Sequence, residues 1–278
     1  MDIITTVAEM RRRLAAESRV ACVPTMGNIH DGHLRLVGIA HAQALCVVTT
    51  VFVNPMQFGA GEGFEGYPRT FDDDCAKLEA AGVHVIFHPD EGEMYPQPQI
   101  FAVEPPPIAN KLEGRFRAGH FRGVATVVLK LFNIVQPQVA VFGKKDYQQL
   151  HIVRSMVDQL ALPVEIVAAE TFRADDGLAL SSRNRFLTPA ERQEAPRLFG
   201  VLNQVRLAVE NGDRNFEAME FAADAELARY GWRVDYVVVR RRATLSSPEA
   251  GDTDLVALGA AKLGQTRLID NLEIRAHP

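Results

Sequence analysis

The sequence predicts an α/β protein with a Rossmann-like parallel sheet that carries helices on both faces, followed by a smaller α+β C-terminal domain. Through about residue 170, short β-branched runs alternate with helical stretches, which is typical of βαβ units. Runs such as VVTTVFV are almost continuously apolar, as in strands buried on both faces of a sheet. After residue 172, two helical stretches precede three strand-like runs, which indicates a separate α+β unit.

The elements of the first part follow from this alternation. The chain begins with a short strand and an amphipathic helix. The next predicted strands are Val20–Val23, Leu45–Val53, Val83–His88, Val139–Phe142 and Val164–Ala169, with helices at about 33–43, 71–81, 120–135 and 146–160. The helix over 120–135 should end before Pro137, because a proline disfavours helical geometry in the residue that precedes it.

The second part has its own turn signals. The triplet Asn211-Gly212-Asp213 separates predicted helices at about 189–211 and 215–229. The predicted strands that follow are Trp232–Arg241, Asp254–Ala260 and Thr266–Glu273. We expect domains of residues 1–171 and 172–278, and a mobile loop over the glycine-rich stretch 59–66.

Composition narrows the function classes. The 278 residues are enough for two domains, and 47% apolar with 23% charged residues is ordinary for a globular protein. Three widely spaced cysteines argue against a disulfide framework and a cysteine-based zinc site. No apolar run approaches the roughly 20 residues that span a bilayer, and no signal peptide is predicted. We therefore expect a cytoplasmic protein without membrane contact; the net charge of -5 disfavours nucleic-acid binding.

The stretch PTMGNIHDGHLRLV, residues 24–37, joins a predicted strand to a predicted helix. Ligands of open parallel sheets gather at the carboxyl ends of strands, and a helix N-terminus suits a phosphate. Gly27 allows close backbone approach. His30 and His33 share one helix face and can donate hydrogen bonds to phosphate oxygens. A surface turn and a zinc site remain alternatives, although the sequence offers no third zinc ligand beside this pair.

The stretch VFVNPMQFG, residues 51–59, also ends a predicted strand. Asn54 and Gln57 are neutral donors and acceptors, which suit a small polar substrate. A plain loop is the alternative, because Asn-Pro is a common turn signal.

The stretch VFGKKDYQQL, residues 141–150, ends a strand at Gly143. Lys144 and Lys145 precede a helix that Asp146 can cap, and a lysine here can place a point charge on a triphosphate. Gln149, one turn into the helix, can face the same cleft. The alternative is a solvated lysine pair before a capped helix.

The stretch DGLALSSRNRFLT, residues 176–188, lies at the predicted domain boundary. Hydroxyl groups and a guanidinium suit phosphate binding, and ligand sites favour domain interfaces; Ser181, Ser182, Arg183 and Asn184 supply these groups. The alternative is a polar linker before a helix with Thr188 as N-cap and Pro189 at its first position. The four stretches together predict reaction at a nucleotide phosphate by positioning and charge stabilisation.

These residues resemble a known family. His30-Asp31-Gly32-His33 resembles the HxGH signature of the nucleotidyltransferase superfamily, and Ser181-Ser182-Arg183-Asn184 its second signature. The set PTMGNIHDGH, FVNPMQFG, YPRT, AGHFRGVATVVLKLFNIVQP, FGKKDYQQL and DGLALSSRN is similar to the pantoate–β-alanine ligase (pantothenate synthetase) family. Another HxGH nucleotidyltransferase with a phosphorylated substrate is the runner-up, but Gln57 and Gln149 stand where that substrate needs cations. A catalytically inactive nucleotide-binding protein is a third hypothesis.

The resemblance implies that ATP and (R)-pantoate form a pantoyl-adenylate, which β-alanine converts to pantothenate and AMP. It implies catalytic roles for His33, His30, Lys145, Arg183 and Ser181. It implies ATP contacts from Met26, Gly27, Asn28, Ile29, His30, Asp31, Gly32, His33, Gly143, Lys144, Lys145, Asp146, Phe172, Leu180, Ser181, Ser182 and Arg183. It implies that Gln57, Gln149 and Asn54 bind pantoate and β-alanine, and that Asp73 and Asp74 bind magnesium. The family resemblance also implies a homodimer.

Overall fold

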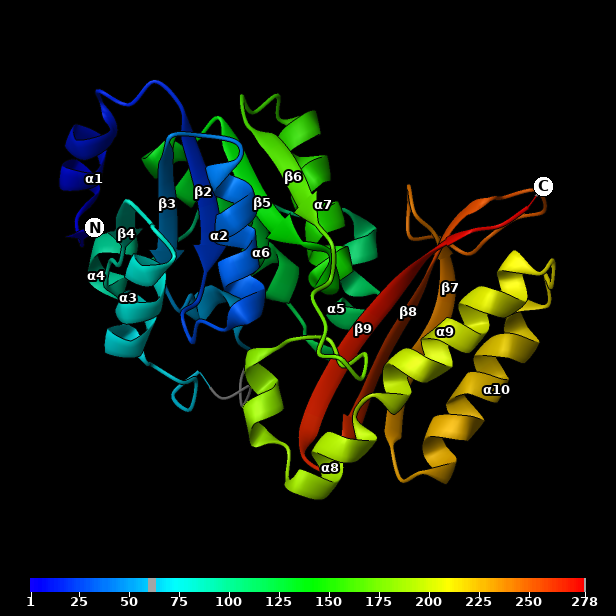
Figure 1. The fold of residues 1–278 in the computed structure, drawn as a ribbon. Coiled ribbons are helices and arrows are strands. Elements are labelled where there is room, and N and C mark those ends of the chain that lie inside the picture. Colours follow the sequence, from blue (N-terminus) through cyan, green and yellow to red (C-terminus); the bar gives the residue numbers. More distant parts are fainter. Residues whose placement is uncertain (60–63, 278) are drawn as a thin grey trace. The chain divides into compact units, whose positions relative to one another are not determined.

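The computed structural model describes residues 1–59 and 64–277, so positions 60–63 of the predicted glycine-rich loop lie outside the described residues. The chain forms two compact units. The first contains Met1–Lys144 and Gln148–Glu170, and the second contains Lys145–Tyr147 and the chain from Thr171 onward (Figure 1).

The first unit is built on a six-stranded parallel sheet, which confirms the predicted fold class. Its strands, in the order β1-β4-β3-β2-β5-β6, are Asp2–Ile4, Val85–Phe87, Cys46–Val51, Val20–Thr25, Val139–Gly143 and Glu165–Ala169. The inner strands are buried along almost their whole length. That burial explains why their sequences are apolar on both faces.

Helices cover this sheet on both faces. The helices between β1 and β6 along the chain are α1 (Val7–Leu14), α2 (Asp31–His41), α3 (Phe71–Ala80), α4 (Glu91–Met94), α5 (Glu113–Phe116), α6 (His120–Val135) and α7 (Tyr147–Gln159). Cys22 and Phe142 share a core cluster with the buried residues of α6. Successive residues of a strand point to opposite faces, so buried neighbours such as Ala21 and Val141 belong to the other face, over which α2 packs.

The strand order creates a topological switch point in the first unit. Strands β3 and β4 lie on one side of β2. Strand β5, which comes later in the chain, pairs with the other edge of β2. Ligands of open α/β sheets bind outside the carboxyl ends of the strands at such a point. The ends of β2, β3 and β5 carry three of the four stretches identified in the sequence.

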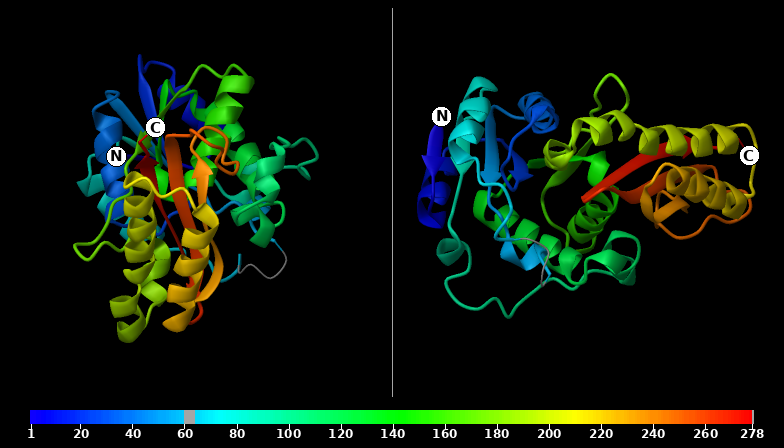
Figure 2. Two further views of the ribbon diagram at one scale, coloured as in Figure 1. Left: turned by 90° about the vertical axis from the view of Figure 1, so that its right-hand side faces the viewer. Right: turned by 90° about the horizontal axis from the view of Figure 1, so that it is seen from below.

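The second unit joins helices to an antiparallel sheet, as predicted. It contains α8 (Pro189–Glu194), α9 (Arg197–Glu210), α10 (Phe216–Arg229), β7 (Arg233–Arg241), β8 (Asp254–Leu263) and β9 (Thr266–Arg275). The sheet has the order β7-β8-β9, and α9 and α10 lie along one face of it (Figure 2). The predicted cap of α8 is confirmed, since Thr188 and Glu191 form a capping box with Pro189 in the first turn.

One helix prediction was wrong. The stretch 189–211 is two helices, because Pro196 has no backbone N–H with which to continue the helical hydrogen bonds, although Ala195 and Pro196 both keep right-handed helical dihedral angles.

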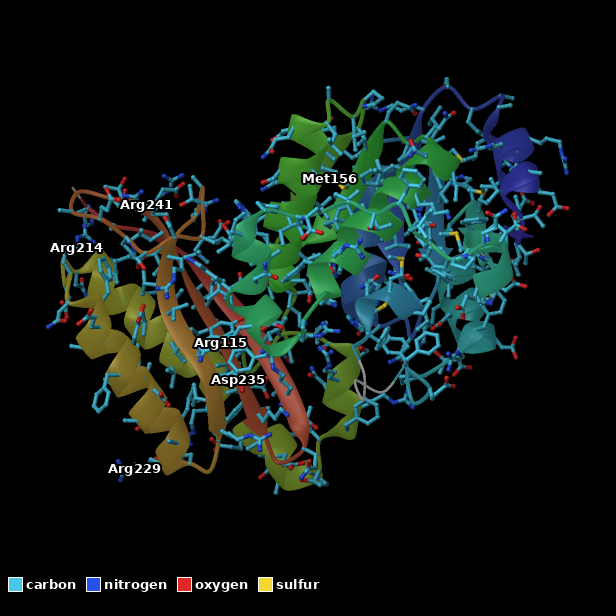
Figure 3. All side chains as sticks on the ribbon, turned by 180° about the vertical axis from the view of Figure 1, so that it is seen from behind. Arg115, Met156, Arg214, Arg229, Asp235 and Arg241 are labelled. Atoms are coloured by element: carbon cyan, nitrogen blue, oxygen red, sulfur yellow. The ribbon has the colours of Figure 1, made fainter. Side chains whose placement is uncertain are left out.

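The strands of this unit are tied by ion pairs at their ends. Arg241 lies at the end of β7 (Figure 3). It pairs with Asp252 at 2.5 Å and Glu249 at 2.7 Å in the loop before β8.

Across residues 1–59 and 64–277, the helices are all too short or too polar to serve as a bilayer-spanning segment.

Candidate active site

The turn between β2 and α2 has an unusual backbone. Gly27 and Asn28 have φ angles of 78° and 54°. Glycine adopts this left-handed region freely and asparagine tolerates it better than most residues. A Cβ atom at position 27 would also lie 2.9 Å from the Asp74 carboxylate. The turn therefore requires glycine for both its conformation and its close packing.

Asp74 of α3 holds this turn in place. Its two carboxylate oxygens accept hydrogen bonds from the backbone N–H groups of Asn28 at 2.8 Å and Ile29 at 2.7 Å. The Thr70 hydroxyl donates to it at 3.2 Å, and the Lys77 ammonium donates to the Ile29 carbonyl at 2.8 Å. Asp74 is only 1% exposed, so α3 clamps the turn after β2 from inside the first unit.

The same geometry bears on the metal prediction. Both oxygens of Asp74 are engaged by backbone N–H groups, so Asp74 does not fit as a magnesium ligand. Asp73 is exposed on the same helix. Within the part of the chain that the structure describes, no three His, Cys, Asp or Glu side chains form a metal-binding group.

The two histidines begin α2. His30 is the N-cap, and its Nδ1 accepts from the Gly32 N–H at 3.1 Å. His33 completes the capping box, with its Nδ1 accepting from the His30 N–H at 3.4 Å. A neutral imidazole that accepts at Nδ1 carries its proton on Nε2. Both rings, with centroids 4.0 Å apart, therefore present Nε2–H donors at a positively polarised helix N-terminus.

Asn54 and Gln57 lie just past the end of β3, around the short turn η1 (Pro55–Gln57). The Asn54 amide donates to Gln57 Oε1 at 3.0 Å and to the Gly123 carbonyl at 3.2 Å. Its oxygen accepts from the Tyr95 hydroxyl at 2.7 Å and from the Met56 N–H at 3.3 Å. Asn54 is thus fully engaged inside the protein and orients Gln57, whose amide nitrogen is the group suited to donate to a substrate.

The backbone of Gln57 is held as well. Its carbonyl accepts from His120 Nδ1 at 2.9 Å, and His120 Nε2 lies 3.0 Å from the Arg117 guanidinium. A Cβ atom at Gly123 of α6 would overlap the carbonyl oxygen of Met56. The close approach of α6 to η1 therefore fixes the loop that carries Gln57.

Gly143 ends β5, and Lys144 and Gln149 follow it along the chain within the first unit. Lys144 pairs with Glu170. Gln149 is partly exposed in the first turn of α7. Its neighbour Gln148 is 4% exposed and bonds the backbone of Ile108, Lys111 and Glu113, so Gln149 is the glutamine of this pair suited to a substrate.

The second unit brings several of the remaining predicted residues together. Lys145, Ser181, Arg183 and Asn184 line one pocket. Asp146 lies 3.8 Å from the Lys145 ammonium. Ser181 caps the turn η4 (Ser182–Phe186) by accepting from the Arg183 N–H at 3.3 Å. The Leu180 N–H donates to the Phe172 carbonyl at 2.9 Å, which closes a hairpin directly before Ser181.

A parallel sheet with a histidine pair at its switch point, and a unit whose pocket gathers a lysine, a serine and an arginine, define an α/β enzyme that acts at a nucleotide phosphate. Residues 2–273 match the family model described as pantoate-beta-alanine ligase, and the chain belongs to that family.

The chain is similar to known pantothenate synthetases along almost its whole length. It is 59% identical over 274 residues to the pantothenate synthetase of Nitrosospira multiformis, covering 99% of this chain and 98% of the relative. The crystal structure of pantothenate synthetase from Thermus thermophilus is 43% identical with a TM-score of 0.93, covering 99% and 100% of the two chains. A pantoate-beta-alanine ligase from Francisella tularensis, complexed with beta-gamma ATP and beta-alanine, is 30% identical with a TM-score of 0.80, covering 98% and 97%.

Sequence patterns missed the residues that hold the site. Tyr95 and His120 act on Asn54 and Gln57 from distant segments, and Lys77 binds the turn after β2 from α3. His120 lies within the block AGHFRGVATVVLKLFNIVQP, where a histidine at the head of an otherwise apolar helix was an available signal. Tyr95 and Lys77 carried no comparable local signal.

Proposed function

We propose that this enzyme condenses (R)-pantoate with β-alanine in an ATP-dependent reaction that passes through a pantoyl-adenylate and releases pyrophosphate and AMP. The observation that carries the proposal is the family match over residues 2–273. The Francisella relative, which is complexed with an ATP compound and beta-alanine, supports both as substrates here.

In the first step, a pantoate carboxylate oxygen bonds to the α-phosphorus of ATP while the bond to the bridging oxygen of pyrophosphate breaks. The chain supplies donors for this step in His30 and His33, whose Nε2–H groups stand at the N-terminus of α2. They would stabilise negative charge on the phosphate oxygens. The backbone from Met26 to Gly32 binds the nucleotide beside them, and Gly143, Lys144 and Phe172 contribute to the same nucleotide.

Gln57 and Gln149 hold pantoate through neutral hydrogen bonds, with Asn54 fixing Gln57 from behind. Lys145 places a point charge on the phosphates, and Ser181, Ser182 and Arg183 bind the triphosphate. In the second step, the β-alanine amine attacks the acyl carbon, the bond to the AMP oxygen breaks, and the amine loses its proton. Neither step needs a covalent enzyme intermediate, so alignment and charge stabilisation supply the catalysis.

We also propose that magnesium enters bound to ATP, with the phosphates as its main ligands, because magnesium commonly binds through substrate phosphates with few protein carboxylates. A homodimer in the cytoplasm completes the proposal. The free thiols of Cys22, Cys46 and Cys75 support a reducing compartment. Light scattering at several protein concentrations tests the dimer, and a monomer mass throughout would contradict it.

The reaction is tested by measuring AMP release and ATP–pyrophosphate isotope exchange. We expect exchange to require pantoate alone and AMP release to require pantoate and β-alanine together, because adenylation precedes amide formation. Exchange that proceeds without pantoate, or AMP release with a phosphorylated substrate in its place, would refute the ligase proposal.

A further inference from the structure

Strand β9 carries a buried charged side chain. Asp270 is 5% exposed, and its carboxylate pairs bidentately with the Arg173 guanidinium at 2.6 and 2.8 Å. Burying an ion pair costs desolvation energy, and an apolar pair of similar volume is often at least as stable. Stability alone therefore does not account for this pair, and a role in fixing a particular geometry does.

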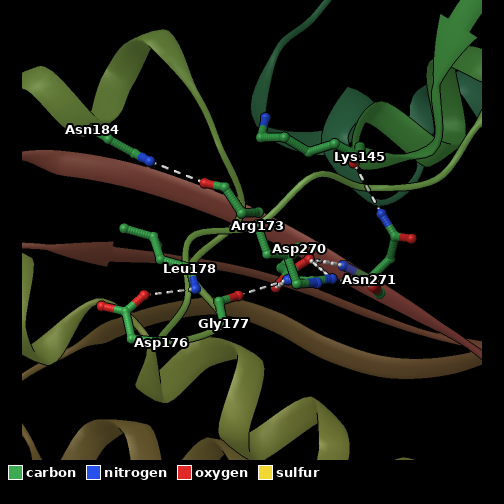
Figure 4. A network of polar contacts seen from close by, with 9 residues as sticks. Lys145, Arg173, Asp176, Gly177, Leu178, Asn184, Asp270 and Asn271 are labelled. Carbon is green, nitrogen blue, oxygen red and sulfur yellow. Dashed lines mark hydrogen bonds and ion pairs between the residues drawn. The ribbon is translucent and has the colours of Figure 1, made fainter. Parts of the chain in front are cut away.

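Both terminal nitrogens of Arg173 also donate to backbone carbonyls. It donates to the carbonyls of Gly177 at 3.0 Å and Asn271 at 3.1 Å, and its guanidinium lies 4.4 Å from the centre of the Phe199 ring. Gly177 belongs to the hairpin that spans residues 172–180, and its bond to Arg173 is drawn in Figure 4. All of these contacts lie within the second unit.

The hairpin leads directly into the predicted triphosphate-binding residues. A β-bridge joins Arg173 to Ala179, and Ser181 follows one residue after the closing bond between Leu180 and Phe172. The Asn184 amide then donates back to the Ala179 carbonyl at 3.0 Å. The position of the turn Ser181–Arg183 is therefore set by the hairpin, and the hairpin by Asp270 through Arg173.

The next residue of β9 reaches a second predicted phosphate ligand. The Asn271 amide donates to the Lys145 carbonyl at 3.0 Å (Figure 4). Lys145, Ser181, Arg183 and Asp270 also line the same pocket. Two adjacent side chains of one strand thus bond two segments that lie far apart in the sequence.

We propose that Asp270 and Asn271 are positioning residues that hold Lys145 and the turn Ser181–Arg183 in one fixed arrangement for the ATP triphosphate. The proposal rests on the proposed function for the identity of the ligand. Neither residue needs to touch ATP. Asp270 neutralises Arg173 and anchors the hairpin, and Asn271 anchors the Lys145 backbone.

The test compares Asp270→Asn with Glu220→Gln, measured on the full-length enzyme. Glu220 of α10 accepts from Arg240 at 3.2 Å and from the Val239 N–H at 2.7 Å, so its amide variant also removes one charge from an ion pair in the second unit. We expect Asp270→Asn to raise the KM for ATP at least about tenfold, with the KM for pantoate changed less than about twofold. Glu220→Gln should leave both KM values unchanged.

A rescue experiment separates positioning from stability. In Arg173→Met/Asp270→Leu an apolar pair replaces the ion pair, and we expect the Tm to recover while the KM for ATP stays high. Recovery of both would overturn the proposal, as would an unchanged KM for ATP in folded Asp270→Asn. If Asp270→Asn does not fold, Asn271→Ala tests the Lys145 arm alone, with the same expected rise in the KM for ATP.

ATP binding without pantoate keeps this proposal distinct from the proposed function. Titration calorimetry should show a Kd for ATP raised in Asp270→Asn by the same factor as the KM. An unchanged Kd would overturn the positioning role. Wild-type enzyme that binds ATP but shows no pantoate-dependent exchange would refute the ligase proposal alone.

Discussion

Asp74→Asn is the sharpest test of how the turn after β2, for which we propose phosphate binding, is held. The carboxylate accepts two backbone N–H bonds at 2.8 and 2.7 Å, and an amide keeps only one acceptor oxygen. One N–H then faces an NH₂ group, and leaving a buried donor unpaired costs about 1–3 kcal/mol. The surviving bond loses its charge assistance, about 1 kcal/mol more. The turn should therefore be destabilised by about 2–4 kcal/mol.

Hydrogen exchange at the Asn28 and Ile29 amides measures this directly. Because each 1.4 kcal/mol is a factor of ten, protection at these two amides should fall roughly 30- to 700-fold. Local exchange is preferable to a global unfolding curve, since a protein of two compact units need not unfold in one step. Asp73, the exposed neighbour of Asp74, supplies the control. Asp73→Asn should leave the protection of the Asn28 and Ile29 amides unchanged.

A magnesium-binding role for Asp74 predicts the opposite result in both measurements. If Asp74 were a magnesium ligand, the asparagine variant would keep its amide protection and would need more magnesium for half-maximal rate. That result would refute the clamp. The clamp itself predicts an unchanged magnesium requirement and a raised KM for ATP.

Three further outcomes are expected. His33→Ala should lower turnover in the AMP-release assay at least about 100-fold through loss of a transition-state donor, and near-normal turnover in a folded variant would contradict that role. Gly123→Ala should lower the Tm by about 3–10 °C because its methyl group overlaps a carbonyl oxygen. Gly38→Ala is the control, because the new Cβ atom meets open space, and it should leave the Tm unchanged. Equal Tm values for the two variants would refute the packing argument. Burial raises the pKa of Cys22 to about 12, so the side chain is almost entirely a thiol at neutral pH. Peptide mapping should therefore find Cys22 alkylated by iodoacetamide only after the protein is unfolded. Alkylation of Cys22 in the native protein would count against this burial.

The predicted sheet was accessible from the sequence because its signals are local. Strands and helices leave their periodicity within a window of about ten residues, and each predicted strand is present with its ends shifted by a few residues at most. The break at Pro196 is also a local signal, and a single helix over 189–211 overlooked it. The histidine pair was predictable for the same reason, since strand, turn and helix are contiguous there.

The residues that hold the site were not predictable in this way. Asp74 binds backbone 45 and 46 residues away from it, and Asp270 binds Arg173 across 97 residues. An aspartate in an acidic helix start, such as Asp72–Asp74, has an ordinary explanation in the helix dipole. Only the fold shows that the third of these aspartates points inward and accepts two N–H bonds.

Three buried polar side chains share this role, each within its own unit. Asp74 and Asn54 are 1% exposed and Asp270 is 5% exposed. A buried polar group destabilises a protein unless it is hydrogen-bonded, and all three bond a backbone segment or side chain next to a predicted substrate contact. A reaction that depends on alignment can lose about 100-fold in rate from a misplacement of about 1 Å. Conservative changes at these three positions should therefore impair adenylate formation nearly as much as changes to the residues that touch ATP or pantoate.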